Sequence, residues 1–134
     1  ETIKCLNALE VNFGAGHSEF KITSSGDVYV IEVGARMGGD FIGSHLVELS
    51  TGYDFLEGVI NIALGKHETP ILKDNNFSGV YFLCKETEQI LPYFSQENNF
   101  DVQKEIQNTI LKNITNSNDR SGYLIYQANK RIKL

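Results

Sequence analysis

Two glutamates, an arginine and a pair of glycines stand close together in the first third of this 134-residue chain. Arg36 lies four residues after Glu32, and Gly38 and Gly39 follow shortly after it. Glu19 precedes them by about a dozen residues. Carboxylates are preferred ligands of hard cations such as Mg²⁺, and an arginine fork suits a phosphate or a carboxylate. Glycines let backbone N–H groups approach a ligand closely. This combination of residue types indicates a metal–phosphate site, although Arg36 in a surface ion pair and the glycines in a plain loop remain alternatives.

A β-hairpin is expected to bring the two glutamates together. Residues 19–23 and 28–33 favour strands because they are aromatic, β-branched or alternating, and the intervening Ser24-Ser25-Gly26-Asp27 is a turn signal. A loop of two or four residues places Glu19 directly opposite Glu32. A loop of three residues would break this pairing, so the prediction depends on the turn.

The same register predicts one apolar face for the hairpin. Phe20 lies opposite Ile31 and Ile22 lies opposite Tyr29, with Val33 completing the face. The other face then carries the glutamates, and its side chains are free to meet a ligand.

Two carboxylates directly across a strand pair repel each other. Their Cβ atoms lie about 4.5–5.5 Å apart, and like charges at that distance are destabilising. A divalent cation held between Glu19 and Glu32 would offset the repulsion. Neutralisation by Lys21 or Arg36, or protonation of one carboxyl group, are alternatives.

The residues just described resemble part of a known family. The run Gly16-His17-Ser18-Glu19-Phe20, followed by Glu32-Val33-Gly34-Ala35-Arg36-Met37-Gly38-Gly39, resembles the C-terminal half of an ATP-grasp ligase domain, in particular the carboxylate–amine ligases that join amino acids. In that family a hairpin carries two glutamates that hold Mg²⁺ on the phosphates of ATP. The resemblance covers residues 14–65 well and the remainder loosely.

The resemblance assigns roles to individual residues. It implies that Glu19 and Glu32 bind Mg²⁺ (or Mn²⁺), and that together with Arg36, Gly38 and Gly39 they bind ATP. It also implies that Arg36 is catalytic and stabilises the transferring phosphoryl group.

Two positions near these residues need separate comment. The family usually has an Asn two residues after the second glutamate as a third metal ligand, and Gly34 stands there without a side-chain oxygen. This difference implies fewer protein ligands or a weakened site. His17 lies on the same strand face as Glu19 if the strand extends that far, and a structural role is favoured over a role as a ligand.

The activity implied by the resemblance is that of an ATP-dependent carboxylate–amine ligase. Such an enzyme activates a carboxylate as an acyl-phosphate with Mg-ATP and joins it to an amine, and in the ligases of closest resemblance both substrates are amino acids. Its partners are the small-molecule carboxylate and amine and the remaining lobes of the same enzyme, and many relatives are homodimers. Two alternatives stay open, a biotin-carboxylase-like or purine-biosynthesis ATP-grasp ligase, and a non-catalytic binding domain derived from the fold.

Composition and charge exclude several other classes. The net charge is −5 and the basic residues are scattered, so a nucleic-acid or anionic-membrane partner is not expected. No apolar run reaches the roughly 18 residues of a transmembrane helix. The two distant cysteines, Cys5 and Cys84, suit reduced thiols in the cytoplasm better than a disulfide framework.

The fold class expected from the pattern of elements is α+β, a mostly antiparallel sheet with two to three helices that corresponds to the C-terminal lobe of ATP-grasp. Residues 1–134 are expected to be a C-terminal fragment, inactive alone, with a metal–phosphate half at 1–65 and a β-rich half at 66–134. Asp54 and Asp40 are expected to cap helices, contact with a substrate amine being the alternative for Asp40. The expected helices are 3–9, 41–49 and 55–63, the expected strands beyond the hairpin are 77–85, 100–112 and 123–128, and 90–94 is expected as a short edge segment.

Overall fold

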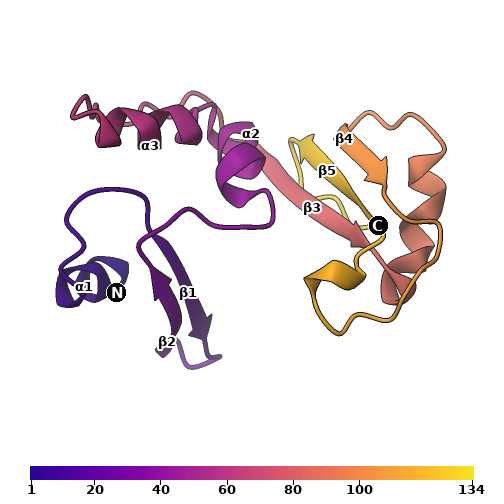
Figure 1. Ribbon diagram of the computed structural model, residues 1–134, viewed down its shortest axis with the longest axis horizontal. Helices are drawn as coiled ribbons and strands as arrows, with labels where there is room; N and C mark the ends of the chain where they lie inside the picture. Colours follow the sequence, from indigo (N-terminus) through magenta and orange to yellow (C-terminus); the bar gives the residue numbers. More distant parts are fainter. The chain divides into compact units, whose positions relative to one another are not determined.

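The computed structural model describes all residues from Glu1 to Leu134 and divides into two compact units, which are treated separately. The first unit comprises residues 1–45 and 54–71, and the second comprises residues 46–53 and 72–134. The elements in chain order are α1 (Thr2–Ala8), β1 (His17–Ile22), β2 (Val28–Gly34), a π-helical turn (Ile42–Leu46), α2 (Val47–Thr51), α3 (Phe55–Ala63), β3 (Phe77–Leu83), a 3₁₀ segment (Lys85–Phe94), β4 (Asp101–Ile106), a 3₁₀ turn (Ser117–Asp119) and β5 (Gly122–Ala128) (Figure 1).

The first unit contains the expected hairpin of β1 and β2, but its turn differs from the prediction. The N–H group of Thr23 donates to the carbonyl oxygen of Asp27 at 3.0 Å, and that of Gly26 donates to the carbonyl oxygen of Thr23 at 3.0 Å. The loop between Thr23 and Asp27 therefore has three residues, where two or four were expected. Gly26 has φ 90°, a conformation that glycine adopts without a steric penalty and that three-residue hairpin loops require.

A β-bulge restores the register between the turn and the glutamates. Near the turn Phe20 pairs with Val30, which corrects the predicted pairing with Ile31. The register shifts between Glu19 and Phe20, and beyond the shift Glu19 pairs with Glu32 as predicted. The extra residue on β2 compensates for the odd loop length, because a bulge places two residues of one strand opposite one of the other.

The predicted apolar face changes with this shift. Ile22 pairs with Val28, where Tyr29 was predicted, and Phe20 pairs with Val30, where Ile31 was predicted. Tyr29 instead pairs with Lys21.

The helices follow the sequence prediction closely. Asp54 caps α3 by accepting a hydrogen bond from the N–H group of Glu57 at 2.8 Å, and Gly65 follows the helix with φ 70°. The helix expected over residues 41–49 is a π-helical turn that continues directly into α2. Asp40 was expected as its cap. Its φ of 51° lies outside the extended region that is typical of a residue at the N-cap.

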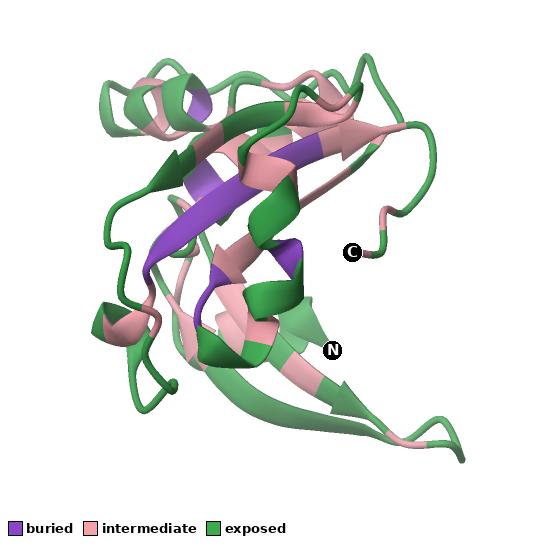
Figure 2. Ribbon diagram, turned by 90° about the vertical axis from the view of Figure 1, so that its right-hand side faces the viewer, coloured by how far each residue is buried: buried purple, intermediate pink, exposed green.

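The second unit is a three-stranded antiparallel sheet with β5 between β3 and β4. Its central strand is buried from Gly122 to Tyr126 (Figure 2). The pairing of β4 with β5 confirms the expectation that the segment after residue 100 pairs with the last strand, although β4 ends at Ile106. The buried hydrophobic residues are Leu83, Cys84, Ile90, Tyr123, Leu124, Ile125 and Tyr126.

The segment after β3 corrects one prediction. Residues 90–94 were expected as an edge strand, but they belong to the 3₁₀ segment Lys85–Phe94. The hydroxyl group of Thr87 accepts from the N–H of Cys84 at 3.0 Å and donates to the carbonyl oxygen of Phe82 at 2.6 Å, so it turns the chain out of β3. This segment contributes the side chain of Ile90 to the buried core.

The α+β class is confirmed, with the strands divided between two antiparallel sheets. Both cysteines are free thiols. None of the helices has the length and apolarity needed to cross a bilayer.

Candidate functional site

The hairpin of the first unit places Glu19 and Glu32 directly across from each other on adjacent strands. Their side chains are 51% and 48% exposed, so both carboxylates reach solvent. Opposite residues of an antiparallel pair project from the same face, which makes the two carboxylates neighbours. The structure thus brings together the two residues that the sequence pattern singled out.

Arg36 joins this pair from the loop after β2. Its Nη2 atom donates to Oε1 of Glu32 at 2.5 Å, and its Nη1 atom donates to the carbonyl oxygen of Met37 at 3.0 Å. The charge of Glu32 is therefore balanced within the chain, which is the ion pair foreseen as an alternative to a cation. Because both side chains are about half exposed, the pair contributes little to stability and can open when a ligand arrives.

His17 lies on the same face, because β1 does extend back to this residue. Its Nε2 atom is 3.8 Å from Oε1 of Glu19, and its side chain is only 18% exposed. Its Nδ1 atom is buried and has no hydrogen-bond partner. The imidazole is thus held beside the carboxylate pair with one nitrogen turned toward Glu19.

The two glycines after Arg36 differ in how closely other atoms surround them. A Cβ atom at Gly38 would lie 3.0 Å from Cδ2 of His17 and 3.0 Å from the side chain of Ile42, so close packing favours glycine there. A Cβ atom at Gly39 would meet nothing within 4 Å. Gly39 is therefore open to a ligand, whereas Gly38 packs the loop against the hairpin.

Gly34 also opens space beside the carboxylates. A Cβ atom there would lie 3.7 Å from Oε1 of Glu32 and 3.5 Å from Nε of Arg36, both ordinary contacts. The position therefore faces the site and could carry a small side chain, but it contributes no ligand atom. The expectation that the site has fewer protein ligands than the family pattern stays a prediction.

The arrangement presents oxygen donors of the kind that hard divalent cations prefer. Nowhere in the chain do three His, Cys, Asp or Glu side chains already converge as a metal site. A cation at Glu19 and Glu32 would therefore require rotation of these half-exposed side chains and further ligands such as phosphate oxygens.

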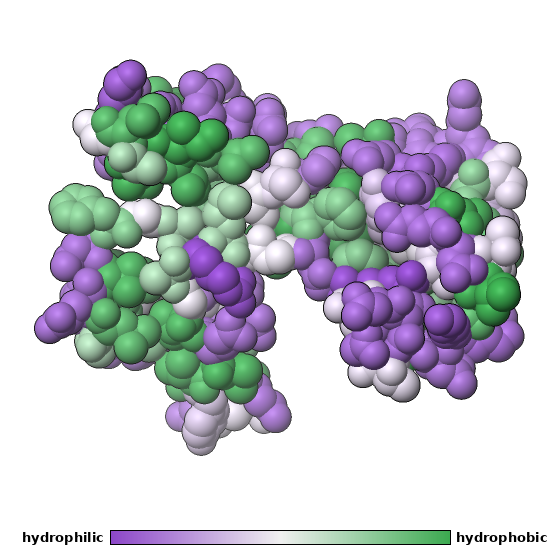
Figure 3. All heavy atoms as spheres, in the orientation of Figure 1, coloured by the Kyte–Doolittle hydropathy of each residue, from purple (hydrophilic) through white to green (hydrophobic).

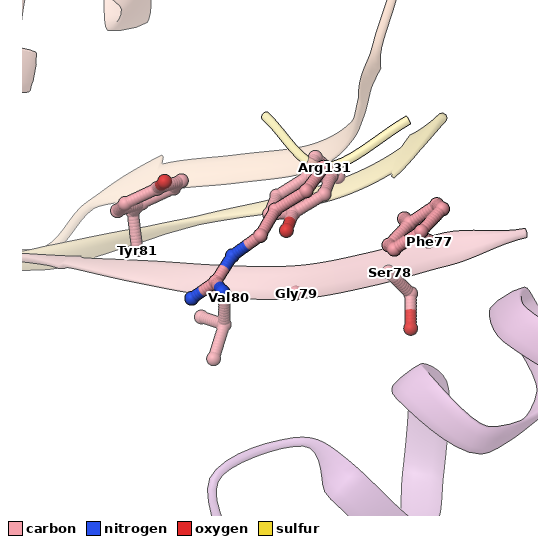
Figure 4. Close-up of a pocket in the computed structure, with 7 residues that line it drawn as sticks. Phe77, Ser78, Gly79, Val80, Tyr81 and Arg131 are labelled. Atoms are coloured by element: carbon pink, nitrogen blue, oxygen red, sulfur yellow. The ribbon is translucent and has the colours of Figure 1, made fainter. Parts of the chain in front are cut away.

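A separate pocket lies on the second unit and contains none of the predicted site residues. Its volume is about 440 Å³, and it is bounded by β3, by Tyr126 of β5 and by Arg131 (Figure 4). Two of its polar side chains are engaged, since the Ser78 hydroxyl donates to the carbonyl oxygen of Leu46 and the Tyr81 hydroxyl donates to that of Ile132. The residues that the sequence predicted for the site therefore all lie outside this pocket, on the hairpin and the loop after it.

Comparisons with known proteins are consistent with the fold that the resemblance implied. No family model matches the sequence, and no curated protein matches it. The structure is similar to that of L-amino acid ligase from Bacillus licheniformis, with a TM-score of 0.65 and 19% identity over 93% of this chain. It is similar to that of phosphoribosylglycinamide synthetase from Anaerococcus prevotii, with a TM-score of 0.64 and 19% identity over 95% of this chain.

These similarities show that the chain shares its fold with a part of each of these two proteins. The chain spans 35% of the length of each of the two proteins.

Proposed function

We propose that this chain forms part of an ATP-dependent ligase that joins a carboxylate to an amine. The observation that carries the proposal is the pairing of Glu19 with Glu32 across the hairpin, with Arg36 bonded to Glu32 at 2.5 Å. The fold shared with an L-amino acid ligase supports the same reaction class.

The proposed roles follow from the chemistry of each side chain. Glu19 and Glu32 would hold Mg²⁺ or Mn²⁺, which when bound neutralises charge on the phosphates of ATP. Arg36 would bind the transferring phosphoryl group, since a guanidinium fork matches phosphate oxygens. Gly39 has no atom within 4 Å of the position that a Cβ would take, so the loop could approach ATP closely there.

The Glu32–Arg36 ion pair suggests how these roles are coupled. The ion pair uses Oε1 of Glu32 and leaves Oε2 available to a cation. If Glu19 and Glu32 shared a cation, Glu32 would hold the guanidinium less tightly, and Arg36 could place its positive charge on the phosphate. The pair would thus keep both groups in place until the nucleotide arrives.

The proposed reaction has two balanced steps. An oxygen of the substrate carboxylate attacks the γ-phosphorus of ATP, and ADP leaves with the electrons of the broken P–O bond. The amine then attacks the acyl carbon, phosphate leaves, and the amine loses a proton. Such phosphoryl transfer depends on positioning and charge neutralisation, which the hairpin residues would supply.

The test is release of ADP by the complete enzyme that contains this chain, with Mg-ATP and a panel of amino acids, offered singly and in pairs. We expect Glu32→Gln to lower this release by about 10²-fold or more, because it removes a charge at the developing phosphoryl transition state. Glu68→Gln, a change at an exposed glutamate of the same unit, is the matched control and should retain full activity. Unchanged ADP release by Glu32→Gln would refute the metal assignment.

A second candidate is a ligase of the biotin-carboxylase or purine-biosynthesis type. The equal similarity to phosphoribosylglycinamide synthetase favours keeping it. Adding bicarbonate and formate to the panel tests for a ligase that activates those acids, because ADP release would then depend on one of them and not on a pair of amino acids. Absence of both ADP release and nucleotide binding would instead favour a non-catalytic binding domain.

A further inference from the structure

The hairpin register places His17 in a specific relation to the two carboxylates. His17 pairs directly with Gly34, just as Glu19 pairs with Glu32 two residues further along β1. Alternate residues of a strand share a face, and directly opposite residues do too. His17, Glu19, Glu32 and the bare position 34 therefore form one block of four neighbours on one face.

Packing fixes the imidazole within this block. The side chain of His17 is 18% exposed, and its Cδ2 edge packs against Gly38. The buried Nδ1 atom has no hydrogen-bond partner, while Nε2 lies 3.8 Å from Oε1 of Glu19. Only Nε2 is thus directed toward the carboxylates, and 3.8 Å is too long for a hydrogen bond between them.

The carboxylate of Glu32 lies near Gly34, the residue that pairs with His17. Its Oε1 atom lies 3.7 Å from where a Cβ atom at Gly34 would stand, directly across the strands from His17. The atoms nearest to that point are Cγ and Nε of Arg36, at 3.4 Å and 3.5 Å, so the Arg36 side chain lies beside the glycine. The block therefore has one imidazole nitrogen and two carboxylates, with the side chain of Arg36 beside position 34 and bonded to Glu32.

We propose that His17 is a metal ligand of this site, through Nε2, and takes the place that a side chain at position 34 would otherwise fill. This inference rests on the proposed function, because it concerns the same cation. Binding requires the Arg36 side chain to move away from position 34 and the half-exposed carboxylates to turn toward His17. An imidazole in the ligand set favours Mn²⁺ and Co²⁺ over Mg²⁺ relative to a set of oxygens alone.

The test uses the protein labelled with ¹⁵N in its histidine rings, with Mn²⁺ and ATP. Pulsed EPR detects a nitrogen bonded to Mn²⁺, and the ¹⁵N label distinguishes a protein imidazole from the nitrogens of adenine. The variants are His17→Gln, with His67→Gln as the matched control at an exposed histidine of the same unit, and Glu32→Gln.

We expect a ¹⁵N coupling in the native protein and in His67→Gln, and none in His17→Gln. The affinity for Mn²⁺ should fall by at least about tenfold in His17→Gln, as losing a group that tunes a metal site typically does. The affinity for Mg²⁺ should fall less.

The failures of the two proposals are distinguishable. If the native protein binds Mn²⁺ and Glu32→Gln abolishes this binding, but no ¹⁵N coupling appears and His17→Gln binds Mn²⁺ normally, then His17 is a structural histidine and only this inference is overturned. If Glu32→Gln binds Mn²⁺ as the native protein does, the proposed metal site itself is overturned.

Discussion

The two compact units differ in where they keep their apolar side chains. In the second unit, β5 lies between two strands, and Leu124 and Ile125 are completely buried. In the first unit, the only residues that are fully buried are Gly43 and Gly58. Much of the first unit's hairpin and α3 is apolar at the surface (Figure 3); the exposed hydrophobic residues there include Val28, Tyr29, Val30, Ile31, Leu56 and Ile60.

This difference separates stability from chemistry. Burial of apolar side chains is the main favourable term in folding, so the second unit carries most of it. The candidate site residues all belong to the first unit, on a two-stranded hairpin of a kind that is marginally stable alone. The hairpin can therefore gain order from a bound ligand, because a ligand stabilises the state that it binds.

The largest expected effect tests this separation with two truncations. Leu124→Ala in β5 should lower the free energy of unfolding by about 2–5 kcal/mol, because it leaves a cavity in the core. Val30→Ala in β2, where the side chain is 51% exposed, should lower it by less than about 1 kcal/mol. Urea denaturation measures both, and equal losses would contradict the comparison.

A smaller effect is expected from two glycine substitutions. A Cβ atom at Gly122 would collide with the main-chain carbonyl oxygen of Glu105, so Gly122→Ala should cost about 1–3 kcal/mol by overpacking. Gly39→Ala meets nothing within 4 Å and should leave stability within about 0.5 kcal/mol. Its expected effect is instead on the KM for ATP, which should rise if the loop approaches the nucleotide.

The comparison of the two units would be contradicted if Gly122→Ala were stable and Gly39→Ala were destabilised. A stable Gly122→Ala variant would mean that β4 and β5 separate readily, and a destabilised Gly39→Ala variant would mean that this loop supports the first unit. Thermal unfolding of both variants, with the ATP titration run on Gly39→Ala, covers these outcomes.

The hairpin shows how far the sequence could be used to predict the site. Its strands and the opposition of Glu19 and Glu32 were predicted, but by way of a loop length that is wrong. β2 is a run of strand-forming residues without clear alternation, so its pattern does not fix the register on its own. The bulge between the turn and Glu32 depends on main-chain hydrogen bonding, for which the side chains carry no signal.

Other parts of the prediction failed or succeeded for equally local reasons. Pro92 suggested an edge strand, but Thr87 bonds back to Cys84 and Phe82 and so starts a 3₁₀ segment instead. The α3 boundaries were predictable because Asp54 and Gly65 are strong cap signals. The packing of His17 was not predictable, because it depends on contact with Gly38 from a distant loop.

The smallest expected effect is an acid dependence that belongs to the second unit. Burial opposes ionisation of Asp101, but hydrogen bonds from Lys104 and Asn98 outweigh it and hold the pKa of this carboxyl below its usual value. A carboxyl group with a lowered pKa in the folded state stabilises the fold above its unfolded pKa of about 3.9. This contribution is lost as the pH falls below that value and through the folded pKa.

We therefore expect the free energy of unfolding to decrease below about pH 4, and to decrease less steeply in Asp101→Asn. Lys104→Gln should flatten the acid limb in the same way, because it removes the main partner of the carboxylate. Lys85→Gln removes an exposed ion pair of the same unit and is the control, which should keep the native slope. An unaltered acid limb in both Asp101→Asn and Lys104→Gln would show that this buried network does not contribute to the stability of the second unit.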